Sequence, residues 1–87
     1  MTLENIQNAV GSKQPAIGYV LNAIEDGRGR IEGNEAWVWN LTHDEQNALL
    51  GLSARYPEQV VALVTHDLNS GRIVNLSMLV SEIRIGN

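Results

Sequence analysis

The chain has no cysteine among its 87 residues, and this constrains its fold more than any other feature. Disulfide bonds and thiolate metal sites, which often stabilise small domains, are therefore excluded. A chain of this length is expected to form one domain, residues 1–87, that buries about 60–65% of its unfolded surface. Its stability must come from apolar packing, for which 25 leucine, isoleucine and valine residues supply the side chains.

Two short amphipathic helices are predicted at the start of the chain. Thr2 is suited to cap a first helix that ends at Gly11. Pro15 suits the first turn of a second helix, which is expected to end at Gly27. The apolar residues follow the spacing of core-facing helical stripes, namely Leu3, Ile6 and Val10 in the first helix and Ile17, Val20, Leu21 and Ile24 in the second.

A small β-hairpin is predicted near residues 30–39. The Gly33-Asn34 pair provides its turn, and Trp37 and Trp39 share one face of its second strand at the period of two. The preceding segment has two glycines in three residues, so we expect a solvated loop that exposes Arg28 and Arg30.

A third helix is predicted from a capping box. In this motif the Thr42 hydroxyl accepts a bond from the Glu45 amide, and the Glu45 carboxylate reaches back to the start of the helix. Gly51 costs this helix about 1 kcal/mol relative to alanine. Pro57 ends the helix, whose apolar stripe consists of Ala48, Leu49, Leu52 and Tyr56.

Residues 59–75 fit two different structures. The sequence Pro57-Glu58-Gln59 suits a first helical turn and Gly71 suits a stop, which favours a helix to about Asn69. The run from Val60 to Thr65 is instead typical of a buried strand, because it is apolar and rich in β-branched residues. In that case Leu68–Gly71 would turn into a second strand. We favour the helix.

The predicted fold is therefore mainly α, a compact bundle of four to five short helices with a possible small β-hairpin near residues 30–39. The alternative is an α+β fold with a hairpin at 59–75. In either fold the chain ends in a helix, whose apolar face consists of Ile73, Leu76, Leu79, Val80 and Ile83.

Composition excludes several classes of function. The net charge of −4 lacks the basic footprint of a protein that follows phosphate backbones, so no nucleic-acid partner is expected. No stretch approaches the roughly 18–20 apolar residues that cross a membrane. The first residues lack the features of a signal peptide. A cytoplasmic location and no membrane partner are therefore expected.

Two Thr-His-Asp triplets, at Thr42–Asp44 and Thr65–Asp67, are the segments that suggest catalysis or metal binding. Helix capping and helix-dipole effects account for them, and the sequence has neither an HExxH motif nor a third histidine. We therefore expect no enzyme activity, catalytic residue, metal site, cofactor or small-molecule substrate. Two alternatives remain: a small His/Asp metal-dependent enzyme, and a helix-turn-helix-like nucleic-acid binder built from the first two helices.

Apolar side chains outside the predicted core stripes indicate a contact surface. Few charges accompany them, because only four residues between Gln46 and Ser81 carry a full charge. Exposed apolar surface of this kind marks association sites. The residues expected to bind a partner are Tyr19, Trp37, Trp39, Leu50, Val74 and Met78.

The predicted function is that of a small acidic, non-enzymatic protein–protein interaction module. Its partner is another protein, a second copy of the chain in a homodimer, or both. By analogy with small acidic phage and plasmid proteins, the expected role is that of an inhibitor or accessory protein. The sequence leaves open whether binding inhibits the partner or scaffolds it.

Overall fold

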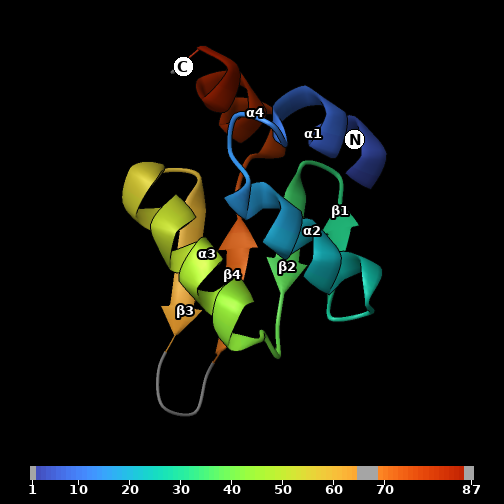
Figure 1. Ribbon diagram of the computed structural model, residues 1–87, viewed down its shortest axis with the longest axis vertical. Coiled ribbons are helices and arrows are strands. Elements are labelled where there is room, and N and C mark those ends of the chain that lie inside the picture. Colours follow the sequence, from blue (N-terminus) through green and yellow to red (C-terminus); the bar gives the residue numbers. More distant parts are fainter. Residues whose placement is uncertain (1, 65–68, 86–87) are drawn as a thin grey trace.

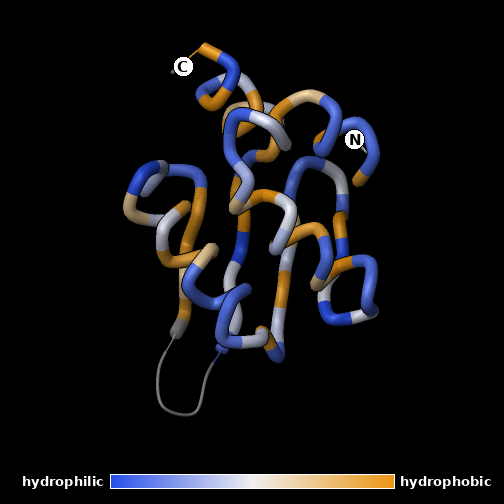
Figure 2. The backbone as a smooth tube through the Cα atoms, in the orientation of Figure 1, coloured by the Kyte–Doolittle hydropathy of each residue, from blue (hydrophilic) through white to orange (hydrophobic). Residues whose placement is uncertain are grey.

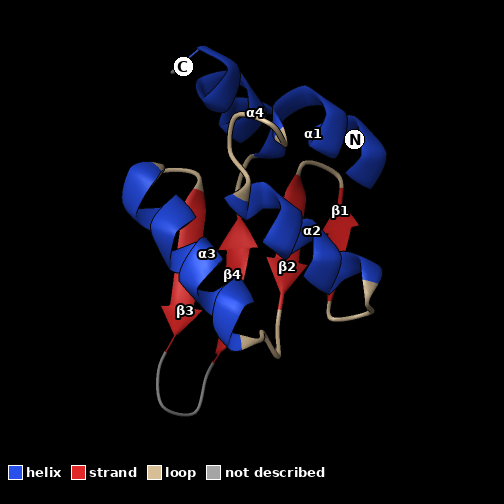
Figure 3. Ribbon diagram, in the orientation of Figure 1, coloured by secondary structure: helices blue, strands red, loops and turns tan. Residues whose placement is uncertain are grey.

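The computed structural model describes residues 2–64 and 69–85, and in these ranges the chain forms an α+β fold. In these ranges two helices precede a β-hairpin, a third helix follows it, and a second pair of strands is followed by a fourth helix; the four strands form a single antiparallel sheet (Figure 3). In chain order the elements are α1 (Leu3–Val10), α2 (Ala16–Glu25), β1 (Gly29–Glu32), β2 (Glu35–Val38), α3 (His43–Arg55), β3 (Val60–Val64), β4 (Asn69–Ile73) and α4 (Leu76–Ile85).

The prediction of a mainly α bundle is wrong, because Val60–Val64 and Asn69–Ile73 are strands where a helix to about Asn69 was expected. Val60–Val64 is strand β3, and it pairs with β4 in a hairpin. Val60 is buried, Val61 is exposed and Leu63 is exposed, which is the period of a strand. The β-branched run therefore outweighs the helix-start signal at Pro57. The alternative hairpin at 59–75 is the fold observed, but β4 already begins at Asn69, so the expected Leu68–Gly71 turn is wrong from Asn69 onward, and Leu68 lies outside the described residues.

Two of the predicted helix starts, at Thr2 and at Thr42, are confirmed in detail. The Thr2 hydroxyl caps α1 by accepting a bond from the Asn5 amide. At the start of α3 both bonds of the capping box between Thr42 and Glu45 are present. These motifs are local in sequence, which is why the sequence alone identifies them. The hairpin near residues 30–39 is confirmed as β1 and β2.

The sheet has the strand order β1-β2-β4-β3, so that β1 and β3 are its two edges. Helices α2 and α3 pack against each other and lie across one face of the sheet (Figure 1). Register places Trp37 between Arg30 on β1 and Arg72 on β4, and Val61 on β3 beyond Arg72. Alternation therefore gives each strand one side toward the helices and one side away from them.

The core lies between the sheet and the two covering helices, with a second part where α1 and α4 pack together at one end of the molecule (Figure 1). β3 consists of apolar residues, whereas β4 is mostly hydrophilic and contributes Ile73 to the core (Figure 2). The fully or nearly fully buried side chains include Ile6, Val10, Ile17, Val20, Ala36, Val38, Leu49, Leu52, Val60, Ile73, Leu76, Leu79 and Ile83.

Asn34, in the turn between β1 and β2, holds the start of α4. Its carbonyl oxygen accepts a bond of 2.8 Å from the Leu76 amide. Its side-chain oxygen accepts bonds from both the amide and the hydroxyl of Ser77. Asn75 caps the same helix by accepting a bond from the Met78 amide. The predicted turn thus also fixes where α4 leaves the sheet.

Two glycines provide a matched test of this packing. A Cβ atom at Gly71 would meet the buried Leu49 side chain and the Val61 carbonyl oxygen, the latter at 3.0 Å, whereas a Cβ atom at Gly51 meets nothing within 4 Å. We expect Gly71→Ala to lower the free energy of unfolding by about 1–3 kcal/mol. Gly51→Ala should raise it by about 0.5–1 kcal/mol, because Gly51 lies on the exposed side of α3. Urea unfolding measures both; shifts of the same sign would contradict the packing of β4 under α3.

Candidate functional site

The face of the sheet away from α2 and α3 carries a tryptophan between two arginines. Arg30, Trp37 and Arg72 are cross-strand neighbours on β1, β2 and β4. The guanidinium carbons lie 5.3 Å and 5.9 Å from the Trp37 ring centroid, within the range of cation–π contacts. We call this side of the sheet the open face, defined by Arg30, Glu32, Glu35, Trp37, Val61, Leu63, Ser70 and Arg72.

Each arginine of the open face is paired with a glutamate. Arg30 lies 3.3 Å from Glu32, and Arg72 lies 3.0 Å from Glu35. All four side chains are well exposed, at 37–65%. Exposed pairs of this kind add little to stability. Their main effect is to make the surface around Trp37 nearly neutral.

The β3 side of the open face is apolar. Val61 and Leu63 are 41% and 47% exposed, which is unusual for two neighbouring side chains of this size on one strand face. The sequence analysis missed both residues, because it placed them in a helix. The signal that could have found them was the β-branched, continuously apolar run from Val60 to Val64, which favours a strand.

The structure does not gather the six predicted binding residues into one patch. Trp37 lies half-buried on the open face, and Trp39, 38% exposed, follows the end of β2 on the same side by alternation. Val74 is half-buried just after β4. Tyr19, Leu50 and Met78 are exposed on three different helices, α2, α3 and α4.

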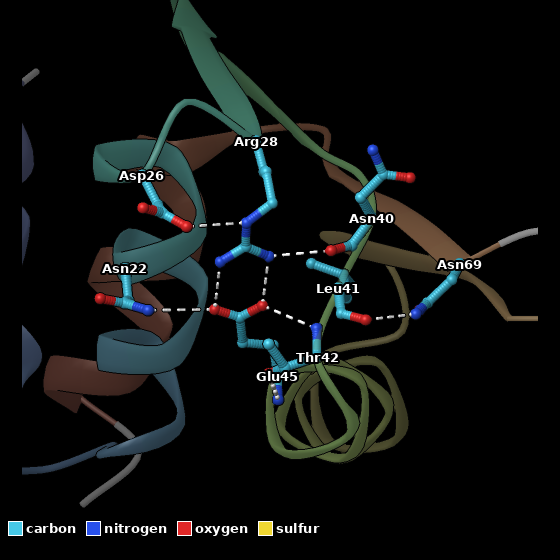
Figure 4. Close-up of polar contacts among 8 residues, drawn as sticks. All are labelled: Asn22, Asp26, Arg28, Asn40, Leu41, Thr42, Glu45 and Asn69. Atoms are coloured by element: carbon cyan, nitrogen blue, oxygen red, sulfur yellow. Dashed lines mark hydrogen bonds and ion pairs between the residues drawn. The ribbon is translucent and has the colours of Figure 1, made fainter.

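A second cluster of polar groups lies between α2, the start of β1 and the start of α3 (Figure 4). Its centre is a two-bond ion pair, in which Arg28 Nη1 and Nη2 donate to Glu45 Oε1 and Oε2 at 2.6 Å and 3.0 Å. Asn22 donates to the same carboxylate at 3.1 Å, and the Thr42 amide donates at 2.8 Å. Arg28 also donates to Asp26 and to the Asn40 carbonyl oxygen.

The expectation that Arg28 belongs to a solvated loop is wrong. Its side chain is only 20% exposed, and that of Glu45 is 2% exposed. Arg30, by contrast, lies in β1 with 65% of its side chain exposed. The partner of Arg28 lies 17 residues away in the chain, so no local pattern indicates the pair.

The electrostatics of this cluster indicate a structural role. The bonds from Arg28 hold the pKa of the Glu45 carboxyl at about 2, against the opposing effect of burial, with smaller contributions from Thr42 and Asn22. The hydrogen bonds that Arg28 makes to Glu45 and to Asp26 raise the pKa of Arg28 above its ordinary value. A carboxylate with so low a pKa is a poor proton acceptor near neutral pH, so the pair is not suited to acid–base catalysis.

The Thr-His-Asp triplets are only partly covered by the structure. His43 and Asp44 are exposed in the first turn of α3, while His66 and Asp67 lie outside the described residues. Among residues 2–64 and 69–85, no group of three or more histidine, aspartate or glutamate side chains is arranged to hold a metal ion. The prediction that the chain uses no metal therefore stays a prediction.

An open groove of about 550 Å³ runs between α1 and α2. Its lining is mixed, with the apolar Leu3 and Leu21, the acidic Glu4 and Glu25, and the amides of Gln7 and Asn22. These groups offer neither an activated nucleophile nor a cation for a phosphate.

Comparison of the chain with protein-family models, curated proteins and solved structures finds no match. Within the part of the chain that the structure describes, no helix has the length and apolar character needed to cross a membrane.

The Arg28–Glu45 pair yields a stability prediction. We expect Glu45→Gln to lower the free energy of unfolding by about 3 kcal/mol, because the change removes a buried charge and leaves Arg28 without its partner. Asp44→Asn is the matched control, since Asp44 is exposed in the same helical turn, and it should change stability by less than about 0.5 kcal/mol. Equal losses in urea unfolding would show that the pair contributes nothing specific.

The same pair predicts a pH dependence. The pKa of Glu45 is lower in the folded protein than in the unfolded chain, so the unfolded chain binds the proton more readily and stability falls as the pH falls. This contribution is complete above about pH 5 and is lost progressively toward about pH 2. The difference in unfolding free energy between the wild-type protein and Glu45→Gln should therefore shrink from pH 7 to pH 2. A difference that stays constant would disprove the assigned pKa.

Proposed function

We propose that the protein is a non-enzymatic protein-binding module and that the open face of its sheet is the binding surface. The observation that carries this proposal is the arrangement on that face, where Trp37 lies between two ion-paired arginines and the exposed Val61 and Leu63 lie on β3, beyond Arg72. Tryptophan and arginine are the residues most enriched at the energetic centres of protein interfaces.

The charge of the open face favours a protein partner over a nucleic acid. Sheet faces that bind single-stranded RNA or DNA combine stacking aromatic rings with a positive groove for the phosphates. Here the two arginines are matched by Glu32 and Glu35, and the whole chain carries −4. The expected partner is a folded protein surface with an apolar centre and a rim of mixed charge.

The binding surface proposed here differs from the one expected from the sequence. It keeps Trp37 and Trp39, adds Val61 and Leu63, and leaves Tyr19 and Leu50 on the helices that cover the other side of the sheet. An inhibitory or accessory role and a cytoplasmic location remain parts of the proposal. The cytoplasm is a reducing compartment, to which a cysteine-free chain is suited.

Paired capture experiments test this proposal. Tagged wild-type protein, Trp37→Ala and Leu50→Ser are used to capture proteins from the same native lysate, and thermal melting confirms that each variant is folded. We expect one stoichiometric protein partner, retained by Leu50→Ser and bound roughly tenfold or more weakly by Trp37→Ala, a loss of about 1.4 kcal/mol or more. Leu50 is the control because it is 43% exposed but lies on α3.

Three outcomes would count against the open face. Loss of the partner from Leu50→Ser but not from Trp37→Ala would move the surface to the helices. Nucleic acid in place of protein would reassign the class of function. A capture that is identical for all three proteins would show that Trp37 makes no contribution.

A further inference from the structure

The two edges of the sheet differ in a way that bears on association. Natural proteins protect edge strands with charges, short length or irregular backbone, because an exposed edge pairs readily with another strand. β1 follows this rule, since its four residues include Arg30 and Glu32. β3 does not, because its five residues are Val-Val-Ala-Leu-Val, without charge, proline or glycine.

The backbone groups of β3 that point away from β4 have hydrogen-bond partners at one end of the strand, at Val60. The Val60 carbonyl oxygen accepts a bond of 3.1 Å from the Ser53 hydroxyl, and the Val60 amide donates to the Tyr56 carbonyl oxygen at 3.0 Å. Both groups of Val60 therefore point away from β4. In an antiparallel ladder this direction repeats every second residue, so the amides and carbonyls of Ala62 and Val64 also point outward. The end of α3 supplies the partners of Val60, so the part of the β3 edge that lies beyond α3 is Ala62–Val64.

We propose that this edge pairs with the same edge of a second copy of the chain. A two-fold axis beside Leu63 places Ala62 of each copy opposite Val64 of the other. The outward amides and carbonyls of these residues then form four backbone hydrogen bonds across the axis. The result is one continuous antiparallel sheet of eight strands, four from each copy.

The composition of the edge favours a second copy as the occupant. Across a two-fold axis every residue near the axis meets its own twin or a close neighbour, so any charge there would meet a like charge. β3 has none. The axis also brings the two Leu63 side chains, each 47% exposed, side by side on the open face, where each covers the other. This inference does not depend on what the open face binds.

Light scattering coupled to size exclusion tests the pairing at high micromolar concentration. The wild-type protein should have twice the monomer mass. Ala62→Pro should be a folded monomer, because proline lacks the outward amide and is tolerated at an edge whose amide does not bond to β4. Ala62→Ser, which keeps the amide, should remain a dimer, as should Trp37→Ala. A monomeric wild-type protein, or a dimeric Ala62→Pro, would overturn the proposal.

Charge variants at Leu63 provide a test that does not require a proline in the strand. Leu63→Lys and Leu63→Glu should each be monomeric, since each places like charges opposite one another at the axis. An equimolar mixture of the two should form a mixed dimer, because the charges are then opposite. This rescue distinguishes self-pairing at β3 from a loss of fold. A mixture that stays monomeric, or a Leu63→Lys protein that remains a dimer, would show that the two edges do not meet there.

Discussion

The arrangement of the helices over the sheet depends on the ion pair between Arg28 and Glu45. Arg28 lies between the end of α2 and the start of β1, and Glu45 lies in the first turn of α3. Their two hydrogen bonds therefore connect α2, β1 and α3, whose relative positions no local sequence signal predicts. The Glu45 carboxylate also completes the α3 cap through the Thr42 amide. One buried carboxylate thus takes part both in the cap of α3 and in the contact of α3 with α2, where Asn22 donates to it.

Because α2 and α3 lie on the same side of the sheet, the other side is left for different contacts. The period of two directs Ala36, Val38 and Ile73 toward the helices and Trp37 and Arg72 away from them. The chemistry of the open face is therefore a direct consequence of strand register. A shift by one residue would bury Trp37 and the arginine, which would be costly without partners for the charge.

The sequence predicted those parts of the fold whose causes are local. Thr2, Thr42 with Glu45, and the Gly33-Asn34 turn act within a few residues, and all three were identified. The segment Val60–Val64 was assigned to a helix because the local start signal at Pro57 competes with its β-branched run, and the pairing with β4 that decides between them is not local. Arg28 was misplaced for the same reason, as its partner lies on another element. Of the residues that define the open face, only Trp37 was recognised as a binding residue.

The position of α4 explains why the open face lacks a cover within residues 2–64 and 69–85. A third layer would require an apolar helix long enough to cross four strands. α4 has the apolar stripe for this, but Asn34 binds its first turn beside the β1–β2 turn, and the helix packs against α1 at the end of the molecule. Its apolar residues Leu76, Leu79 and Ile83 are therefore already buried in the core and do not face the sheet's open side. No element of the described residues covers Trp37, Val61 and Leu63, so a contact there would bury apolar area that the described fold leaves exposed.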